Sequence, residues 1–334
     1  MARRSGSTTI SEVALRAGVS PATVSRVMNG RFGGEDEVAE RVRAAARDLA
    51  YAPSQLARAL ALGQTKAVAF LVPDLANPTF QAVLSGFSKT AARDGYRALV
   101  ADSAESPDDE SLLATELRRR SDAIVLCAPR MPEDELVALA KTLQPLVLIN
   151  RPSPLISAPS LSIDYQAGIQ DIARYLFELG HRKFALVQGP EQSVSNSLRL
   201  RGFDEFRRSA RGVSVHNVSA GAGLDDGFAA ASAVRASGAT AAVAFNDLVA
   251  IGLINGLAEL GVKVPEDMSV TGFDDIPFAR FCAPTLTTAS VPHRELGVEA
   301  WQRLHSLILD EQPAHNLLFQ PRLEIRDSAT AVTA

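Results

Sequence analysis

Short, continuous runs of apolar residues recur along the chain from residue 67 onward, separated by amphipathic stretches of about a dozen residues or more. Unbroken valine, leucine and isoleucine runs indicate strands covered on both faces, as in parallel sheets. Alternation of such strands with helices predicts doubly wound α/β architecture. The runs form two sets, 67–72, 97–101, 123–128 and 145–149, then 184–188, 241–245 and 269–273. We therefore expect two parallel sheets in tandem.

The first fifty residues have a different, purely helical pattern. Thr9 and Glu12 have the spacing of a capping box, and Gly18 follows the apolar stripe that begins there. Ser20 can cap a second helix with Pro21 at its first position, where the missing N–H costs nothing. A third periodic run covers residues 38–49. These signals predict an all-α unit of three short helices.

Charge is distributed unevenly along the 334 residues, which are too many for a single ordinary core. Residues 1–62 carry nine basic and six acidic side chains, a net charge of +3, so the remainder carries −7 of the total of −4. A basic end on an acidic body suggests a polyanionic partner. Chance clustering on a solvated surface is the alternative that charge alone leaves open.

Several classes of protein are disfavoured. The N-terminus has no apolar run behind its arginines, so no secretory signal is expected, and no segment approaches the roughly 20 apolar residues of a membrane span. Cys127 and Cys282 are the only cysteines, which fits a reducing cytoplasm. The histidines lack metal-ligand spacing, Walker A is absent, and residues 221–227 miss the dinucleotide fingerprint. We expect no catalytic residue, no metal and no cofactor.

The second predicted helix lies in the stretch VSPATVSRVMNG, residues 19–30. Val24 and Val27 can be buried together while Arg26 points elsewhere at helical spacing. Two helices joined by a tight turn form a helix-turn-helix, whose second helix can enter the major groove. Arg26 could bind guanine O6 and N7, and the hydroxyls suit phosphates or base edges: Ser20, Thr23 and Ser25. Spacing alone leaves an ordinary helical hairpin equally open.

Polar residues that directly follow the predicted strands are the candidates for a small-molecule site. Ligands of open parallel sheets bind beyond the carboxyl ends of the strands, and two such sheets leave a cleft. The candidates are Asp74, Asn77, Phe80, Asn150, Arg151, Asn246, Asp247 and Asp274, with Arg199 at a helix start. Such groups suit a polyhydroxylated ligand, because each hydroxyl donates and accepts. Helix caps and turns are the simpler explanation for Asp74 and Asn77-Pro78.

Taken in order, eight motifs carry a family resemblance: TISEVALRAGVSPATVSRVMNG, YAPSQLARALALGQT, VPDLANPTF, LGHRKFALVQGP, SLRLRGF, FNDLVAIG, VTGFDDIPFA and PTLTTASVP. The chain resembles the lactose-repressor (LacI/GalR) family of bacterial transcription regulators from about Thr9 to about Arg326. The resemblance implies a helix-turn-helix headpiece (1–50), a hinge helix and linker (51–64), and an effector-binding sensor (65–334) related to periplasmic sugar-binding proteins. Its N-subdomain would span about 65–162 and 291–320, and its C-subdomain about 163–290 and 321–330.

The resemblance also assigns residues. Pro21, Ala22 and Arg26 take base-reading positions, and Leu60, with Ala57 beside it, would wedge into the minor groove and kink the duplex. The DNA-binding set is Thr9, Ser20, Pro21, Ala22, Thr23, Ser25, Arg26, Asn29, Ala57 and Leu60. The effector-binding set is Asn77, Phe80, Arg151, Asp164, Arg199, Asn246 and Asp274. The chain departs from the family pattern at Gly34-Glu35, before the third helix, and at Ala222, where an aromatic is common.

The expected function is that of an allosteric repressor. A homodimer would bind a pseudo-palindromic operator on double-stranded DNA, under control of a small effector, a sugar or sugar derivative, in the bacterial cytoplasm and at the nucleoid when bound. The tail DSATAVTA has no leucine heptads, which favours a dimer over a tetramer. The alternatives are a sugar-binding protein without a DNA role, and a sugar-processing enzyme with Asp164 and Asp274 as its only possible acid-base pair.

Overall fold

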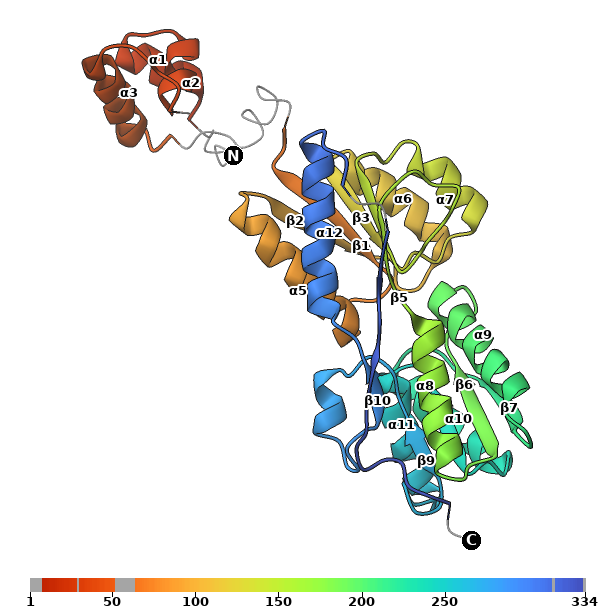
Figure 1. Cartoon of the computed structure of the whole chain (residues 1–334). Helices are drawn as coiled ribbons and strands as arrows, with labels where there is room; N and C mark the ends of the chain where they lie inside the picture. Colours follow the sequence, from red (N-terminus) through yellow and green to blue (C-terminus); the bar gives the residue numbers. More distant parts are fainter. Residues whose placement is uncertain (1–7, 29, 52–63, 314–315, 333–334) are drawn as a thin grey trace. The chain divides into compact units, whose positions relative to one another are not determined.

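The computed structural model of the chain describes residues 8–28, 30–51, 64–313 and 316–332 (Figure 1). It divides into two compact units, Met1–Thr65 and Lys66–Ala334. The expected hinge helix lies outside the described residues, and so do three of the predicted DNA contacts: Asn29, Ala57 and Leu60.

The first unit holds three helices: α1 (Ile10–Ala17), α2 (Pro21–Met28) and α3 (Asp36–Asp48). The capping box is confirmed, since the Thr9 amide donates to Glu12 Oε2 over 2.6 Å and the Glu12 amide donates to Thr9 Oγ1 over 3.4 Å. Gly18 ends α1 with φ +68°, a backbone that glycine adopts without strain. The predicted joint burial of Val24 and Val27 is confirmed as well.

The second unit contains two lobes, each an α/β sandwich. The N-lobe sheet is parallel, in the order β11-β5-β4-β3-β1-β2. Its strands are β1 (Ala67–Val72), β2 (Arg97–Asp102), β3 (Ala123–Cys127), β4 (Leu146–Ile149), β5 (Ser160–Ile163) and β11 (Asn316–Phe319). The helices α5 (Pro78–Arg93) and α12 (His293–Ile308) pack together, as do α6 (Pro107–Arg118) and α7 (Glu133–Ala140).

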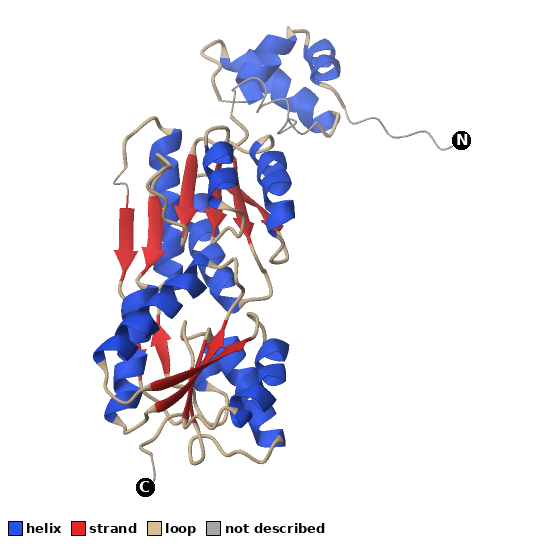
Figure 2. Cartoon of the chain, turned by 90° about the vertical axis from the view of Figure 1, so that its right-hand side faces the viewer, coloured by secondary structure: helices blue, strands red, loops and turns tan. Residues whose placement is uncertain are grey.

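The C-lobe, like the N-lobe, has a sheet flanked by helices (Figure 2). Its sheet is parallel, in the order β7-β6-β8-β9. Its strands are β6 (Lys183–Gln188), β7 (Ser214–Ser219), β8 (Ala241–Ala244) and β9 (Ser269–Thr271). Its helices form the pairs α8 (Tyr165–Glu178) with α9 (Val194–Ser209), and α10 (Leu224–Ala236) with α11 (Asp247–Glu259). A 3-10 turn, η1 (Pro277–Arg280), and a small antiparallel pair, β10 (Thr288–Ser290) with β12 (Arg322–Glu324), complete it.

Alternation along each strand explains the two helix layers. In β1, Val68, Phe70 and Val72 join the core under α5 and α12, while Ala69 and Leu71 join the core under α6 and α7. The continuous apolar runs of the sequence are therefore strands buried on both faces, and the predicted fold class is confirmed.

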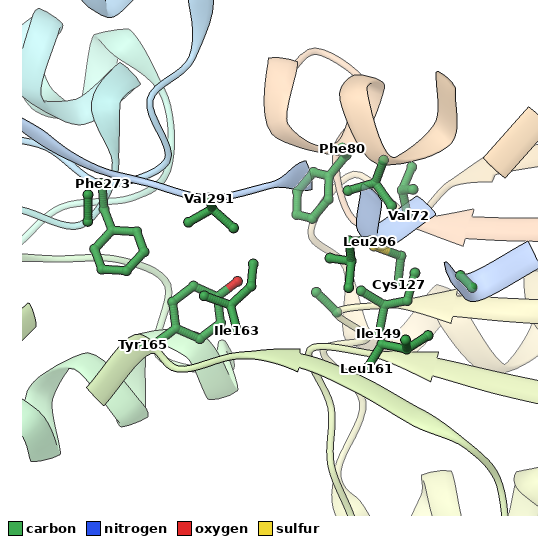
Figure 3. Packing of buried hydrophobic residues seen from close by; sticks show 14 of the residues in the cluster. Val72, Phe80, Cys127, Ile149, Leu161, Ile163, Tyr165, Phe273, Val291 and Leu296 are labelled. Atoms are coloured by element: carbon green, nitrogen blue, oxygen red, sulfur yellow. The ribbon is translucent and has the colours of Figure 1, made fainter. Parts of the chain in front are cut away.

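One apolar cluster runs continuously through both lobes (Figure 3). Phe80 and Leu296 belong to its N-lobe part, and Tyr165 and Phe273 to its C-lobe part. Ile163, at the end of β5, and Val291, just after β10, lie between them in the figure. The chain passes between the lobes at both of these residues, so the crossing segments are packed into the core.

Candidate effector cleft and headpiece surface

A small cavity lies at the carboxyl ends of the strands of both sheets. In each lobe the strand order reverses beside the first strand, between β1 and β3 and between β6 and β8, and such switch points open a crevice for ligands. The residues that line the cavity come from both lobes: Asn77, Thr79, Phe80, Glu105, Ala128, Arg130 and Asn150 from the N-lobe, and Tyr165, Ser195, Arg199, Ala222, Phe245, Asn246 and Asp274 from the C-lobe.

Arg199 is the central cation of the C-lobe side. Its guanidinium carbon lies 4.2 Å from the ring centres of Tyr165 and Phe273 and 4.6 Å from that of Phe245. Only 4% of the residue is exposed, and its Nε and Nη1 have no hydrogen-bond partner among the described residues. Burial lowers the pKa of Arg199, and the neighbouring Asp274 opposes that shift. Buried N–H groups without partners are costly, so this guanidinium is suited to bind acceptor oxygens of a ligand.

Asp274 connects the two lobes across the cavity. Its Oδ2 accepts a hydrogen bond of 3.1 Å from Thr79 Oγ1, near the start of α5. Its Oδ1 lies 3.7 Å from Arg199 Nη2 and 3.8 Å from His293 Nε2. Burial raises the pKa of the Asp274 carboxyl, while His293 and Arg199 oppose that shift. The same carboxylate can therefore hold the lobes together or turn to a ligand.

Two of the predicted effector residues are helix caps as well as lining residues. Asn77 Oδ1 accepts from the Thr79 amide at the start of α5. Asn246 Oδ1 accepts from the Val249 amide, and its Nδ2 donates to the Ala222 carbonyl over 2.9 Å. Both structural interactions fix these side chains at the edge of the cavity, which leaves part of each amide available to a ligand.

Arg151 and Asp164 are not among the lining residues. Arg151 is buried and donates from Nη2 to the Met131 carbonyl over 3.0 Å. Asp164 caps α8 by accepting from the Ala167 amide, and its own amide donates to the Phe319 carbonyl. Asp164 thus joins two segments that pass between the lobes. As effector contacts, both residues remain predictions.

The N-lobe side carries an ion pair that sequence reasoning missed. Arg130 donates from Nε and Nη2 to the two carboxylate oxygens of Glu105, over 2.5 and 2.9 Å, and from Nη1 to the Ala128 carbonyl. Both residues follow predicted strands, at 97–101 and 123–128. Their positions after strands are the same signal that selects Asn77 and Asp274.

Backbone strain also concentrates at this edge. Non-glycine residues with positive φ follow β2, β3, β4 and β9: Ala104 (51°), Glu105 (60°), Ala128 (48°), Asn150 (53°), Asp274 (116°) and Asp275 (55°). Each such conformation costs on the order of 1–3 kcal/mol and persists where the surrounding structure fixes the geometry, as it commonly does at ligand sites. The free space inside is about 30 Å³, room for one or two water molecules.

The headpiece surface presents the predicted DNA contacts that the structure describes. Pro21, Ala22 and Arg26 of α2 are exposed, and Thr23 is partly exposed beside them. Ser20 Oγ accepts from the Thr23 amide over 3.1 Å, so its hydroxyl caps α2. The Glu35 side chain makes no capping hydrogen bond to α3. The α2 face therefore carries the short polar groups and the one arginine of the recognition stretch.

Comparisons with known proteins decide the family. Residues 9–54 match the family described as bacterial regulatory proteins, lacI family, and residues 173–329 match the periplasmic binding protein-like domain. The transcriptional repressor CytR of Escherichia coli K12 is 31% identical over 97% of both chains. The chain belongs to the LacI family. The MalR regulator of Streptomyces coelicolor is also 31% identical, over 97% of both chains.

Solved LacI-family structures agree with this membership. The lac repressor dimer bound to operator and the anti-inducer ONPF has a TM-score of 0.86 and 25% identity, covering 98% of this chain and 100% of that one. The CelR–cellobiose complex has a TM-score of 0.71 and 26% identity, covering 96% and 100%. Like its relatives, this LacI-family chain is a transcriptional regulator and not an enzyme.

Among the described residues, no helix has both the length and the hydropathy needed to cross a membrane. No group of three or more histidine, cysteine, aspartate or glutamate side chains within the described ranges could hold a metal ion.

Proposed function

We propose that this regulator is a repressor whose homodimer binds a pseudo-palindromic operator and whose operator affinity is controlled by a sugar or sugar derivative. The proposed effector control rests on the cavity between two lobes, which is lined by Arg199, Asp274 and aromatic side chains. The proposed DNA binding rests on the polar face of α2 in a three-helix headpiece. The protein would act in the cytoplasm, at the nucleoid when bound.

The proposed effector contacts are the predicted residues that line the cavity: Asn77, Phe80, Arg199, Asn246 and Asp274. Arg151 and Asp164 are proposed to act indirectly, by fixing the loop at Met131 and the crossing segments. The proposed DNA contacts are those of the predicted set, including the three outside the described residues.

The narrowness of the cavity gives the control mechanism. Ligand pockets typically measure 300–1,000 Å³, so a cavity with about 30 Å³ of free space must widen before a sugar can enter. Widening separates Thr79 from Asp274, which belong to different lobes. An effector that prefers one lobe orientation shifts the population toward that orientation. By linkage, the factor by which effector changes operator affinity matches the factor by which operator changes effector affinity. The sign of the response, induction or co-repression, is an outcome of the tests below.

A second copy of the chain is the proposed occupant of an exposed apolar surface on the C-lobe. Phe281 is 83% exposed and Phe278 58%, beside a groove that Leu224, Leu248 and Ile251 line. The lac repressor, which this chain resembles over its whole length, is a dimer on its operator. Sedimentation equilibrium of the full chain is the direct check.

The test of the proposed function has two parts. Purified full-length protein is used to select fragments from its source genome, and the selected sequence is expected to contain an inverted repeat. A thermal-shift screen of sugars and nucleobases then identifies the effector, because a ligand bound only by the native state raises the melting temperature. Failure to enrich any sequence would reject the DNA role, and turnover of a sugar would reject the regulator in favour of an enzyme.

A further inference from the structure

The charges that line the cavity occur as two matched pairs, one on each lobe. Among the described lining residues the only charged side chains are Glu105 and Arg130 on the N-lobe, and Arg199 and Asp274 on the C-lobe. Each guanidinium therefore has a carboxylate beside it, and the lining carries no net charge. The two pairs differ in geometry: Arg130 and Glu105 are joined by two hydrogen bonds, whereas the Arg199–Asp274 separation is 3.7 Å.

From this we infer that Glu105 and Arg130 form a specificity-determining pair, which binds a neutral, hydroxyl-bearing end of the effector and disfavours an anionic one. The inference rests on the proposed function, since it names how that same cleft selects its ligand. Nε of Arg130 donates to Glu105, but Nη1 and Nη2 each carry two N–H groups and each donates one hydrogen bond among the described residues.

The pair is held rigidly in place, as specificity requires. Glu110 lies beneath it, 1% exposed, and one carboxylate oxygen accepts from the amides of Arg130 and Met131, over 2.7 Å each. The other accepts from Ser103 Oγ over 3.3 Å, which joins the loops after β2 and β3. Burial raises the pKa of Glu110, and these hydrogen bonds oppose that shift. Glu110 fixes the backbone at Arg130, and Glu105 and the Ala128 carbonyl hold its guanidinium, so the Arg130 side chain has little freedom to follow a misplaced ligand.

Hydrogen-bond chemistry explains the preference for a neutral ligand. A sugar hydroxyl can donate to a carboxylate and accept from a guanidinium at once, so it satisfies both partners. The side chain of Glu105 is 27% exposed, which leaves its oxygens reachable, while that of Arg130 is 4% exposed. A carboxylate ligand could accept from Arg130, but it would face the charge of Glu105 in a narrow, poorly hydrated space.

The experiment compares matched neutral and acidic sugars. Full-length protein is titrated calorimetrically with glucose and glucuronate, and with galactose and galacturonate, and the ratio of the two affinities is determined for each pair. The wild type is expected to prefer the neutral member by at least about tenfold. In Glu105→Gln the counter-charge of Arg130 is removed, and the preference should fall by roughly tenfold or reverse. Glu178→Gln, an exposed carboxylate on α8, is the matched control and should keep the wild-type ratio.

A second variant tests the same pair independently, in case Glu105→Gln does not fold. Arg130→Gln removes the cation and leaves Glu105, so it should weaken binding of the neutral sugar by roughly ten- to a hundredfold and bind the acid no better. Melting temperatures without sugar establish that each variant is folded. An unchanged ratio in Glu105→Gln, or a wild type that binds both members equally well, overturns the inference while sugar sensing stands. A wild type that binds none of the four sugars also overturns the inference. The selection of genomic fragments tests DNA binding independently, so the two failures can be told apart.

Discussion

At the scale of single residues, Arg199 is a buried cation that lines the cavity with N–H groups unpaired within the described part of the chain. Three aromatic rings surround it, and its Nε and Nη1 are buried without partners among the described residues. An orphaned buried donor costs about 1–3 kcal/mol. Binding an effector oxygen would recover part of that cost, and this recovery would contribute to the free energy of effector binding.

Arg199→Ala should therefore abolish the effector response, since it removes the donors that a ligand would satisfy. Operator affinity should stay within a few-fold of the wild type, because the headpiece is a separate compact unit. Fluorescence anisotropy on operator DNA, with and without effector, measures both. Arg201→Ala, an exposed arginine on the same helix, is the control and should respond normally. Retained response of Arg199→Ala at ordinary effector concentrations would remove the residue from the site.

His181 carries a pH prediction. It is 3% exposed, and its Nε2 lies 3.0 Å from the Thr330 carbonyl, which can only accept, so Nε2 carries the hydrogen. Nδ1 lies 2.9 Å from Thr240 Oγ1 and accepts from it. Burial lowers the pKa of His181, against the opposing hydrogen bond to Thr330. At a pH slightly below about 6.5, the imidazole therefore stays mostly neutral in the folded protein but is protonated in the unfolded chain.

A lowered folded-state pKa gives stability that is present above the unfolded pKa of about 6.5 and declines as the pH falls below it. Urea unfolding of the full chain should show a free energy of unfolding that decreases from pH 7.5 to 5.5. His181→Gln should be less stable at pH 7.5 but should lose less on acidification, because Gln does not titrate. An identical pH slope in the two proteins would contradict the assignment.

The candidate site was predictable from sequence only in part. The rule that ligand residues follow strands selects Asn77, Asn246 and Asp274 by position, and all three line the cavity. It cannot distinguish a ligand contact from a helix cap, and two of these residues are also caps. Glu105 and Arg130 also follow strands, but their pairing depends on hydrogen bonds between loops that are 25 residues apart in the chain, and no local pattern predicts that pairing.

At the scale of elements, paired glycines allow α10 to pack closely against α11, and α5 against α12. A Cβ on Gly252 of α11 would lie 1.9 Å from the Leu224 carbonyl oxygen, and one on Gly227 of α10 would lie 2.0 Å from that of Val249. The same reciprocal contact joins Gly86 of α5 and Gly297 of α12. Backbone meets backbone here, so neither partner can move aside as a side chain would.

Gly252→Ala should destabilise the second unit by about 1–3 kcal/mol, the typical cost of overpacking. The alanine gains about 1 kcal/mol of helix propensity, so the predicted sign depends on the clash being the larger effect. Chemical denaturation monitored by circular dichroism measures the change. Gly33→Ala, where the added methyl group meets open space, serves as control. A stabilised Gly252→Ala protein would show that α10 and α11 can separate at low cost.

The helix α2 carries the DNA prediction. Arg26→Ala should lower operator affinity by about 1–3 kcal/mol and reduce the preference for operator over random DNA, because a bidentate base contact is lost. Arg47→Ala removes the same charge from the exposed end of α3 and should not change that preference. Titrations at several salt concentrations separate the two effects. Equal losses on operator and random DNA for Arg26→Ala would assign it to the phosphates.

The elements that sequence reasoning missed lack the signal it used. The predicted strands are all present as β1 to β4, β6, β8 and β9. The strand β7 reads SVHNVS and is largely exposed, because it lies at the edge of its sheet. β5 is four residues long and alternates serine with apolar residues, although all four are buried. Its burial comes from its central place between β4 and β11, which is a property of the tertiary fold.

At the scale of the whole molecule, two observations fit one regulator. The cleft has a lobe-to-lobe hydrogen bond between Thr79 and Asp274 that ligand entry would have to break. The headpiece is a compact unit of its own, joined to the sensor through residues 52–63. Control of DNA binding from the cleft therefore requires the effector to prefer one lobe orientation, and the coupling free energy measures that preference.

A closed thermodynamic cycle measures how strongly the cleft controls operator binding. Operator affinity is measured with and without saturating effector, and effector affinity is measured with and without saturating operator, on the full-length dimer in one buffer. Operator affinity is expected to change by about 5- to 150-fold, a typical coupling, and effector affinity to change by the matching factor that linkage requires. An operator affinity that stays constant while the cleft demonstrably fills would contradict control from the cleft.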